Sequence, residues 1–264
     1  MSDDSSLEGI GEAYERVLRE GAYKELTGKV AFRLKGNPLK LLQGISSNDA
    51  HAPVNAFLNR FGVLVILFNQ FKVNEQEFLI VFERQFTERF LEHARTHLKL
   101  SRTTAKEEPS LKAFHVIGRT QAPASEISIP QRIGFLNLSD QLPFALKEMS
   151  DAVYECFRVE HGISVQGVDF DREMLLNTNW QDAVSFTKGC FLGQEVMARV
   201  HNLGKPPKRL VSVASQEKVE RVMQGGEVAG KVTSACYSPR LKKHVGFACI
   251  PNNEKKLDNA EVIT

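Results

Sequence analysis

The densest group of chemically reactive side chains lies in residues 188–195. This octet reads Lys-Gly-Cys-Phe-Leu-Gly-Gln-Glu, so a cation, a thiol, an amide and a carboxylate stand beside two glycines. Cys190 closely follows Lys188, and a cysteine near a cation or a helix N-terminus favours the reactive thiolate. Most free cysteines are instead small buried hydrophobic residues, so both interpretations of Cys190 stay open at this point.

The other cysteines and the histidines show no spacing typical of metal ligands. His93 and His97 stand four residues apart in a segment of helical period, where such pairs are usually solvated. We therefore predict no stably bound metal. Four scattered thiols without a CxxC pair are typical of a reducing compartment. They are Cys156, Cys190, Cys236 and Cys249.

The bulk composition indicates an ordinary globular protein. The chain has 264 residues, of which 42% are hydrophobic and 25% charged. A formal net charge of +2 gives no field that would draw the protein to nucleic acid. The most apolar run, residues 63–68, is far shorter than the roughly 20 residues that cross a bilayer. We expect neither nucleic acid nor a membrane as a partner.

The first residues also bear on the location. Asp3 and Asp4 stand where a signal or mitochondrial presequence would carry basic residues, and no apolar segment follows. We therefore expect a cytoplasmic protein.

Hydrophobic periodicity predicts a mixture of helices and strands. Helical period marks residues 7–18, 86–100 and 145–160. Strand patterns mark residues 30–34, 63–68, 78–82 and 133–138. Polar residues and prolines predict surface connections at residues 101–110 and 121–131. Residues 162–182 lack a period and are predicted to form a long packed loop.

Changes in composition divide the chain into three parts, and the fold class they predict is α+β. We predict an N-terminal α+β domain at residues 1–120 and a second α+β segment, containing the octet, at residues 121–204. The remaining residues, 205–264, contain short strand-like runs separated by turn residues. They predict a small C-terminal β-barrel.

The octet resembles the KGC[YF]xGQE signature of the YgfZ family, a folate-binding branch of the glycine-cleavage T-protein superfamily with mitochondrial relatives in iron–sulfur assembly. Residues 158–163 are similar to the R-x-E-x-G segment of the family, and residues 42–49 resemble its LQG-x-x-T-x-D element. Residues 230–234 are similar to the barrel of the T-proteins. The resemblance covers nearly the whole chain, and the octet is its diagnostic part.

The resemblance implies a T-protein-like ring of ferredoxin-like or antiparallel α+β domains around a central hole that binds tetrahydrofolate. In this interpretation the Glu160 carboxylate accepts two N–H hydrogen bonds from the pterin, and Tyr154 stacks on it. Arg199 pairs either with the glutamate tail of the folate or with Glu195. The octet supplies three further candidate cofactor-binding residues, which are Lys188, Gln194 and Glu195.

One stretch departs from the family pattern. T-proteins that transfer an aminomethyl group carry an aspartate in the strand after a glycine-rich turn, whereas only aliphatic residues follow Gly62 here. Val63 stands where YgfZ relatives often carry a basic residue. Neither Val65 nor Ile66 can act as an acid or base. A classical aminomethyltransferase is therefore disfavoured, and whether the chain is an enzyme stays open.

The function that the resemblance implies is that of a folate-binding accessory protein for iron–sulfur cluster assembly or repair, acting through Cys190. A soft thiolate can ligate iron or sulfur transiently or take part in redox exchange. One cysteine cannot hold a cluster alone, so we expect iron–sulfur assembly proteins or client enzymes as partners and no stably bound cluster. The alternatives are a tetrahydrofolate-dependent aminomethyl or methyl transferase and a purely structural interaction protein.

Overall fold

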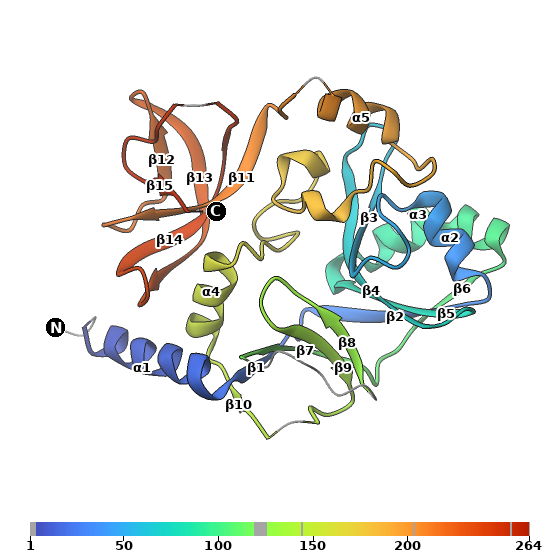
Figure 1. Cartoon of the computed structure of the whole chain (residues 1–264), viewed down its shortest axis with the longest axis horizontal. Coiled ribbons are helices and arrows are strands. Elements are labelled where there is room, and N and C mark those ends of the chain that lie inside the picture. Colours follow the sequence, from blue (N-terminus) through green and yellow to red (C-terminus); the bar gives the residue numbers. More distant parts are fainter. Residues whose placement is uncertain (1–3, 119–125, 144, 203, 254, 264) are drawn as a thin grey trace.

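Three five-stranded sheets surround a common centre in the computed structural model (Figure 1). The structure describes residues 4–118, 126–143, 145–202, 204–253 and 255–263. The T-protein-like α+β architecture that we predicted is confirmed. Over these residues, no helix is both long enough and apolar enough to span a membrane.

The first sheet combines early and central parts of the chain. Its strands are β1 (Ala22–Glu25), β7 (Lys112–Ile117), β8 (Ile127–Pro130), β9 (Phe135–Ser139) and β10 (Lys147–Glu148). Their order is β10-β1-β7-β9-β8, with β10 parallel to β1 and the other pairs antiparallel. Helix α1 (Asp4–Glu20) leads into this sheet, and α4 (Asp151–Glu160) leaves it towards the barrel (Figure 1).

The second sheet is antiparallel throughout and has an aromatic core. Its strands are β2 (Lys29–Lys35), β3 (Val54–Leu58), β4 (Leu64–Asn74), β5 (Glu77–Glu83) and β6 (Thr104–Glu107), in the order β3-β4-β5-β2-β6. Helices α2 (Pro38–Ile45) and α3 (Thr87–Ser101) cover one face, with a 3₁₀ helix, η1 (Arg84–Phe86), before α3. The centre of the Phe90 ring of α3 lies 5.3 Å from the centre of the Phe32 ring and 5.2 Å from that of the Phe82 ring.

The first two sheets pack against each other through aliphatic side chains. Ala31, Leu79 and Val81 of the second sheet form one buried cluster with Leu136 and Leu138 of the first. Because alternate residues of a strand point to opposite faces, β2 and β5 serve the aromatic core with one face and this interface with the other. The β1–β2 turn therefore lies between the two sheets.

The third sheet curls into the C-terminal barrel. Its strands are β11 (Lys208–Ser215), β12 (Arg221–Gln224), β13 (Glu227–Ser238), β14 (Lys243–Pro251) and β15 (Glu261–Val262), in the order β12-β13-β14-β11-β15. Val211 and Val213 point into the barrel core, whereas Leu210 and Ala214 face the centre of the molecule. This alternation along β11 joins the barrel to the rest of the chain.

A long packed segment fills the space between the second sheet and the barrel. It contains two 3₁₀ helices, η2 (Leu175–Asn177) and η3 (Gln181–Ala183), and leads to α5 (Gln194–Asn202). Leu175, Leu176 and Trp180 are buried in the central cluster together with Met197 of α5. The aperiodic loop predicted at residues 162–182 is therefore buried by its own apolar side chains.

Two predicted elements differ from the structure. The helix predicted at residues 145–160 begins only at Asp151, because the Ser150 hydroxyl caps it by accepting the N–H of Val153 at 3.4 Å. Residues 147–148 instead form β10. The connection predicted at residues 101–110 contains β6, whose pairing with β2 is non-local and left no local signal.

The predicted division at residue 120 and residues 121–125 of the second predicted connection lie outside the described residues. The first sheet takes strands from both sides of that division. Residues 127–130 of the same connection form β8, which pairs with β9. The barrel predicted to begin at residue 205 has its first strand at Lys208.

Candidate functional site

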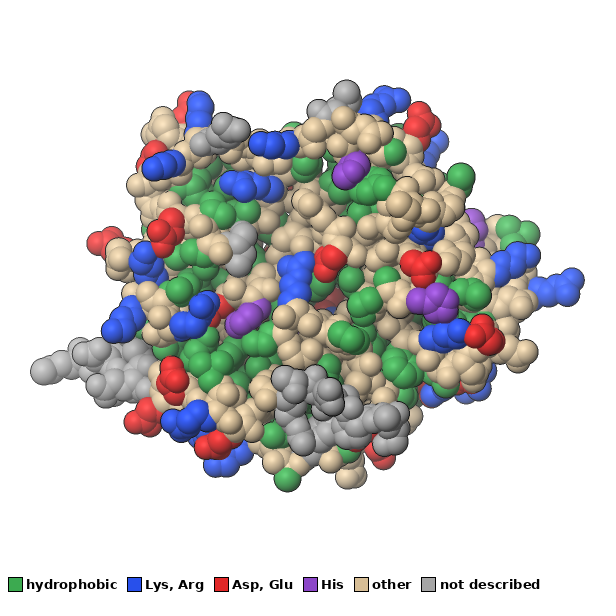
Figure 2. Space-filling view, in the orientation of Figure 1, with side chains coloured by type: hydrophobic (Ala, Val, Ile, Leu, Met, Phe, Trp, Pro, Cys, Tyr) green, Lys and Arg blue, Asp and Glu red, His purple; other side chains and the backbone are tan. Residues whose placement is uncertain are grey.

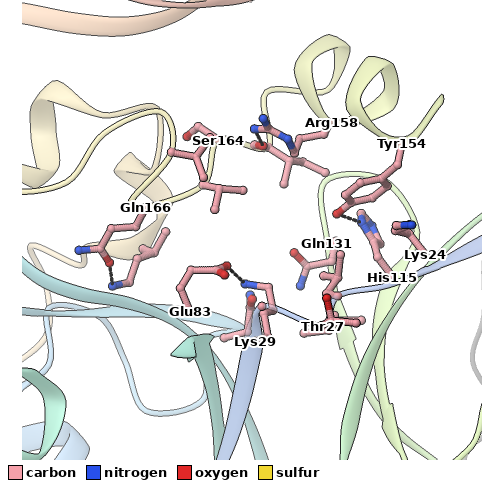
Figure 3. A pocket seen from close by; sticks show the side chains of 18 of the residues that line it. Lys24, Thr27, Lys29, Glu83, His115, Gln131, Tyr154, Arg158, Ser164 and Gln166 are labelled. Atoms are coloured by element: carbon pink, nitrogen blue, oxygen red, sulfur yellow. Dashed lines mark hydrogen bonds and ion pairs between the residues drawn. The ribbon is translucent and has the colours of Figure 1, made fainter. Parts of the chain in front are cut away.

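A cavity of about 360 Å³ lies between the first two sheets, α4 and the loop after α4 (Figure 3). The β1–β2 turn, β4, β9, α4 and residues 163–168 contribute to its walls. Leu67, Phe68 and Trp180 provide apolar surface. The walls come from parts of the chain that are far apart in sequence, so no single motif marks this cavity.

Helix α4 presents four side chains to the cavity, which are Asp151 at its start and Tyr154, Glu155 and Arg158 further along. Residues four positions apart on a helix lie on the same face, which brings Tyr154 and Arg158 together. Glu160 is two positions beyond Arg158 and therefore lies on the opposite side of the helix.

Arg158 is a buried cation with a complete set of partners. Its guanidinium donates to Glu155 at 2.7 Å and to Asp169 at 2.6 Å. Asp169 in turn accepts hydrogen bonds from Thr233 at 2.9 Å and Ser234 at 2.5 Å, both on β13. Because a buried charge is costly without such partners, this network fixes the cavity wall to the barrel.

Four carboxylates line the cavity, which the aliphatic sequence of β4 did not reveal. Glu83 pairs with Lys29 at 2.6 Å in the middle of the view in Figure 3. Asp151 pairs with Lys24 at 2.6 Å. The other two, Glu25 and Glu155, also face cations. The cavity is thus charged even though β4 contributes no carboxylate to its wall.

The buried His115 and the half-buried Tyr154 form a hydrogen-bonded pair in the cavity wall (Figure 3). His115 Nε2 lies 2.8 Å from the carbonyl oxygen of Ile133, which can only accept, so Nε2 carries the proton. Nδ1 then accepts from the Tyr154 hydroxyl at 3.0 Å. Burial lowers the pKa of His115 to about 4 and raises the pKa of Tyr154. Both groups are therefore neutral hydrogen-bonding groups at pH 7.

Two glutamine side chains supply amide groups at the cavity. Gln166 accepts the N–H of Leu67 at 2.8 Å and donates to the carbonyl of Val65 at 3.1 Å, which fixes its orientation. Gln131 differs, since its Nε2 is buried and has no hydrogen-bond partner among the described residues. A buried donor of this kind is costly unless a ligand or water satisfies it.

The octet forms a separate site, held to the second sheet by Lys188. The Lys188 ammonium donates to the carbonyl oxygens of Ser46 at 2.6 Å and Asn48 at 3.0 Å. Burial lowers the pKa of Lys188 to about 8. The Ser47 hydroxyl donates to the carbonyl of Ala183 at 2.6 Å, so the same short segment also holds the chain just before the octet.

The rest of the octet alternates between anchors and exposed groups. Phe191 is buried in the central cluster, and Gly193 has a φ of 85° with its Cα facing the β3–β4 turn. An added Cβ at Gly193 would lie 2.5 Å from the carbonyl oxygen of Asn59, so only glycine fits there. Cys190 is exposed, whereas Cys156 is buried and the other two cysteines are half-buried.

Most of the predicted cofactor-binding residues do not line the cavity. Of the six, Tyr154 alone belongs to its wall. Lys188 is committed to backbone carbonyls, and Gln194 lies at the start of α5. Glu195 pairs with Arg199 at 3.3 Å on the surface, and it is one of the two partners predicted for Arg199.

Glu160 has partners quite different from the predicted pterin. Its carboxylate accepts from Tyr14 of α1 at 2.6 Å and from Arg240 at 2.8 Å, and also from Ser238. Its side chain is completely buried, as is that of Tyr14. The residue therefore joins α1, α4 and the barrel and does not face the cavity.

Sequence reasoning missed Lys29, Glu83, His115 and Gln131 as cavity residues. Each comes from a different strand or turn and has no chemically suggestive neighbour in sequence. Arg158 lies in the same predicted segment as Glu160. The helical spacing of Arg158 from Tyr154 was the signal in the sequence that could have identified Arg158 as the residue on the cavity face of the helix.

The described residues contain no group of three or more His, Cys, Asp or Glu side chains placed to hold a metal ion. The His93 ring packs 5.6 Å from the Phe57 ring, and burial lowers its pKa. His93 is therefore partly enclosed by the aromatic core, in contrast to the solvated position we predicted.

Comparison with known proteins relates the chain to one superfamily. The family model of the glycine cleavage T-protein C-terminal barrel domain matches residues 208–263. The crystal structure of the glycine cleavage system aminomethyltransferase T from Bartonella henselae superposes with a TM-score of 0.76 and 11% identity, covering 96% of this chain and 86% of that one. At this identity the likeness concerns the fold.

Sequence relatives point to two further members. The mitochondrial iron–sulfur cluster assembly factor IBA57 of Mus musculus is 32% identical over 111 residues, covering 37% of this chain and 29% of that protein. The tRNA-modifying protein YgfZ of Colwellia psychrerythraea is 32% identical over 90 residues, covering 33% and 27%. The chain thus spans under a third of the length of each of these curated relatives.

The Glu160 network predicts a stabilising role for this carboxylate. Glu160→Gln removes the charge opposite Arg240 and turns an amide group towards buried donors, so we expect the free energy of unfolding to fall by about 1–3 kcal/mol. The measurement is urea denaturation at pH 7. Glu195→Gln is the matched control, since its exposed pair with Arg199 should change stability by less than about 0.5 kcal/mol. Equal stability of the two variants would contradict the role.

His115 predicts a loss of stability in acid. The unfolded chain binds a proton at its ordinary pKa of 6.5, whereas the folded protein does so only at about 4. Unfolding is therefore favoured as the pH falls from 6.5 to 4, with a contribution of up to about 3 kcal/mol. Urea denaturation at several pH values across this range gives the free energy of unfolding as a function of pH. His115→Gln should make this dependence on pH less steep. His51→Gln, which changes an exposed ring, is the control and should leave it as in wild type. An identical slope in His115→Gln would refute the assignment.

Proposed function

Because the chain belongs to the YgfZ and T-protein-like family, we propose that it is a folate-binding accessory protein for iron–sulfur cluster assembly or repair, acting through Cys190. The relatives named for iron–sulfur assembly and for tRNA modification motivate the proposal. The observation that carries it is the exposed Cys190 thiol on a loop whose neighbours are fixed on both sides.

The arrangement of the octet suits a thiol that must meet another molecule. Lys188 and Phe191 are anchored, while Cys190 between them is exposed. A surface thiol held on a rigid support loses little conformational freedom on contact with a partner. We propose that Cys190 ligates iron or sulfur transiently or takes part in redox exchange.

The cavity residues fit tetrahydrofolate in chemical type. Trp180 and Leu67 offer apolar surface for a flat ring, and Gln131 offers an amide donor in need of an acceptor. In this proposal Gln131 and Tyr154 hold the ring, with Arg158 in the supporting wall. Tetrahydrofolate carries one-carbon groups when bound. The proposal thus assigns the cofactor contacts to residues that line the cavity and no longer to Glu160, which does not.

Partners follow from the limits of a single thiolate. Iron–sulfur clusters are held by several ligands, so a partner protein or client enzyme would supply the others. We propose that the isolated chain retains no stoichiometric cluster after anaerobic reconstitution. All four cysteines are free, and we propose a cytoplasmic location.

A second candidate function is a tetrahydrofolate-dependent aminomethyl or methyl transferase. The observation in its favour is the set of cavity carboxylates, above all Glu83, which the sequence of β4 did not suggest. Glu83 is ion-paired with Lys29 at 2.6 Å, so one of its oxygens already has a cationic partner. We therefore rank this function second.

The thiol proposal predicts a specific loss of function in cells. In a strain that depends on this chain, Cys190→Ser should remove most of the activity of cluster-dependent enzymes while protein levels stay constant, because serine does not ligate iron as a thiolate does. Enzyme assays and immunoblots measure both quantities. Cys249→Ser, on β14, is the matched control and should behave as wild type. Normal enzyme activity with Cys190→Ser would leave only a structural role for the octet.

The cavity proposal predicts a measurable contribution of Gln131 to folate affinity. Titration calorimetry with tetrahydrofolate should show that Gln131→Leu binds about tenfold more weakly, since one buried hydrogen bond is lost. Gln141→Leu changes an exposed residue and should bind as wild type does. Absence of binding to wild type would overturn the cofactor part of the proposal, and folate-dependent turnover of an aminomethyl donor would move the second candidate ahead.

A further inference from the structure

A second cavity of about 550 Å³ lies on the far side of the wall of the first. Pairs of successive residues separate the two cavities. Gln131 and Ile163 line the first cavity, and their chain neighbours Arg132 and Gly162 line the second. The second cavity is bounded by the beginning of β11, the turn after α4 and the segment around η3. None of the octet residues lines it, so it is independent of the proposed thiol site.

Arg209 is the unusual group in this second cavity. Its Nε is buried and has no hydrogen-bond partner among the described residues. Within the same part of the chain, no carboxylate forms an ion pair with its guanidinium, in contrast to the buried Arg158. A buried guanidinium donor without an acceptor costs free energy, and an anion entering the cavity would satisfy it.

The other charged groups of the cavity are already committed. Arg132 donates to the carbonyl oxygens of Gly162 and Asn179 and pairs with Asp182 at 3.2 Å. The one carboxylate of the lining is thus matched by Arg132, which leaves the positive charge of Arg209 uncompensated there. The Arg132 guanidinium also lies 4.3 Å from the centre of the Trp180 ring.

Amide groups complete the setting. The Nδ1 hydrogen of His161 is already used, since Nδ1 lies 2.9 Å from the carbonyl oxygen of Phe157, which can only accept. The amide of Gln181 donates one hydrogen to Leu176 at 3.3 Å and has a second. A planar guanidinium with amide neighbours is typical of sites that bind carboxylate or phosphate oxygens at two points.

We propose that this second cavity binds a small oxyanion, a phosphate or a carboxylate, with Arg209 as its principal ligand. The anion makes a two-point contact with the planar guanidinium, and the paired Arg132 and Asp182 line the same cavity. This site is distinct from the cavity proposed for folate and does not depend on the proposed function.

Trp180 reports occupancy through Arg132, which lines the second cavity and stacks on this single tryptophan of the chain, itself in the wall of the first cavity. The intact protein is titrated with inorganic phosphate or with succinate at constant ionic strength, and tryptophan fluorescence and calorimetry are recorded on the same samples. We expect a saturable response to at least one anion. The anion that saturates at the lower concentration identifies the source as phosphate or carboxylate.

Variants of the barrel arginines decide the assignment. Arg209→Gln should weaken binding at least about tenfold, since a charge-assisted contact is lost. Arg221→Gln, which removes an exposed arginine of the same barrel, should bind as wild type does. If thermal unfolding shows that Arg209→Gln is not folded, Arg209→Lys replaces it and should bind more weakly than wild type, because lysine keeps the charge without the planar fork. No saturation in wild type, full affinity in the Arg209 variant, or equal loss in Arg221→Gln would overturn the proposal.

Discussion

The buried ion pair between Arg158 and Asp169 is the constraint on which the arrangement of this molecule depends. Arg158 extends from α4, Asp169 from the long loop, and the hydroxyls of Thr233 and Ser234 bind Asp169 from the barrel. Removing one partner of such a pair typically costs about 3–5 kcal/mol, because a charge is left without compensation in a medium that solvates it poorly. Three segments that no local propensity brings together are therefore held in one geometry.

The same principle explains how the octet is positioned. Lys188 is partly buried and interacts with the Asp49 carboxylate only through charge, and its ammonium donates to the carbonyls of Ser46 and Asn48. Burial disfavours the charged ammonium and therefore lowers the pKa of Lys188. The carbonyls offset part of that cost by solvating the ammonium. The residues resembling two separate family motifs, 42–49 and 188–195, are thus two halves of one contact.

Sequence predicted the parts of the fold that depend on local patterns. The helical period of α3, the apolar runs of β4 and β5 and the short strand-like runs of the C-terminal sheet are all visible in the sequence. The short strands β6 and β8 were missed because their pairing partners lie elsewhere in the chain. The start of α4 was misplaced because Ser150 decides it, and a single cap is a weaker signal than several apolar positions.

The candidate site divides in the same way. The octet was found because its chemistry is contiguous, whereas Glu83, His115 and Gln131 meet only after two sheets have packed. Arg158 and Glu160 show the intermediate case. Residues two apart on a helix point about 200° away from each other, so only one could face the cavity. The spacing from Tyr154 favours Arg158, and the structure agrees.

The separation of the cavity from the exposed thiol limits how the two can cooperate. The octet does not line the cavity, so an occupant of the cavity does not touch Cys190. The link is the segment between Trp180, in the cavity wall, and Lys188. Asn48 connects this segment to the cavity wall. Its side-chain amide donates to the carbonyl of Asp182 in the segment and to the carbonyl of Val54 in the wall. Under the proposed function, any effect of folate on the thiol would have to pass through this segment, because no direct contact joins them.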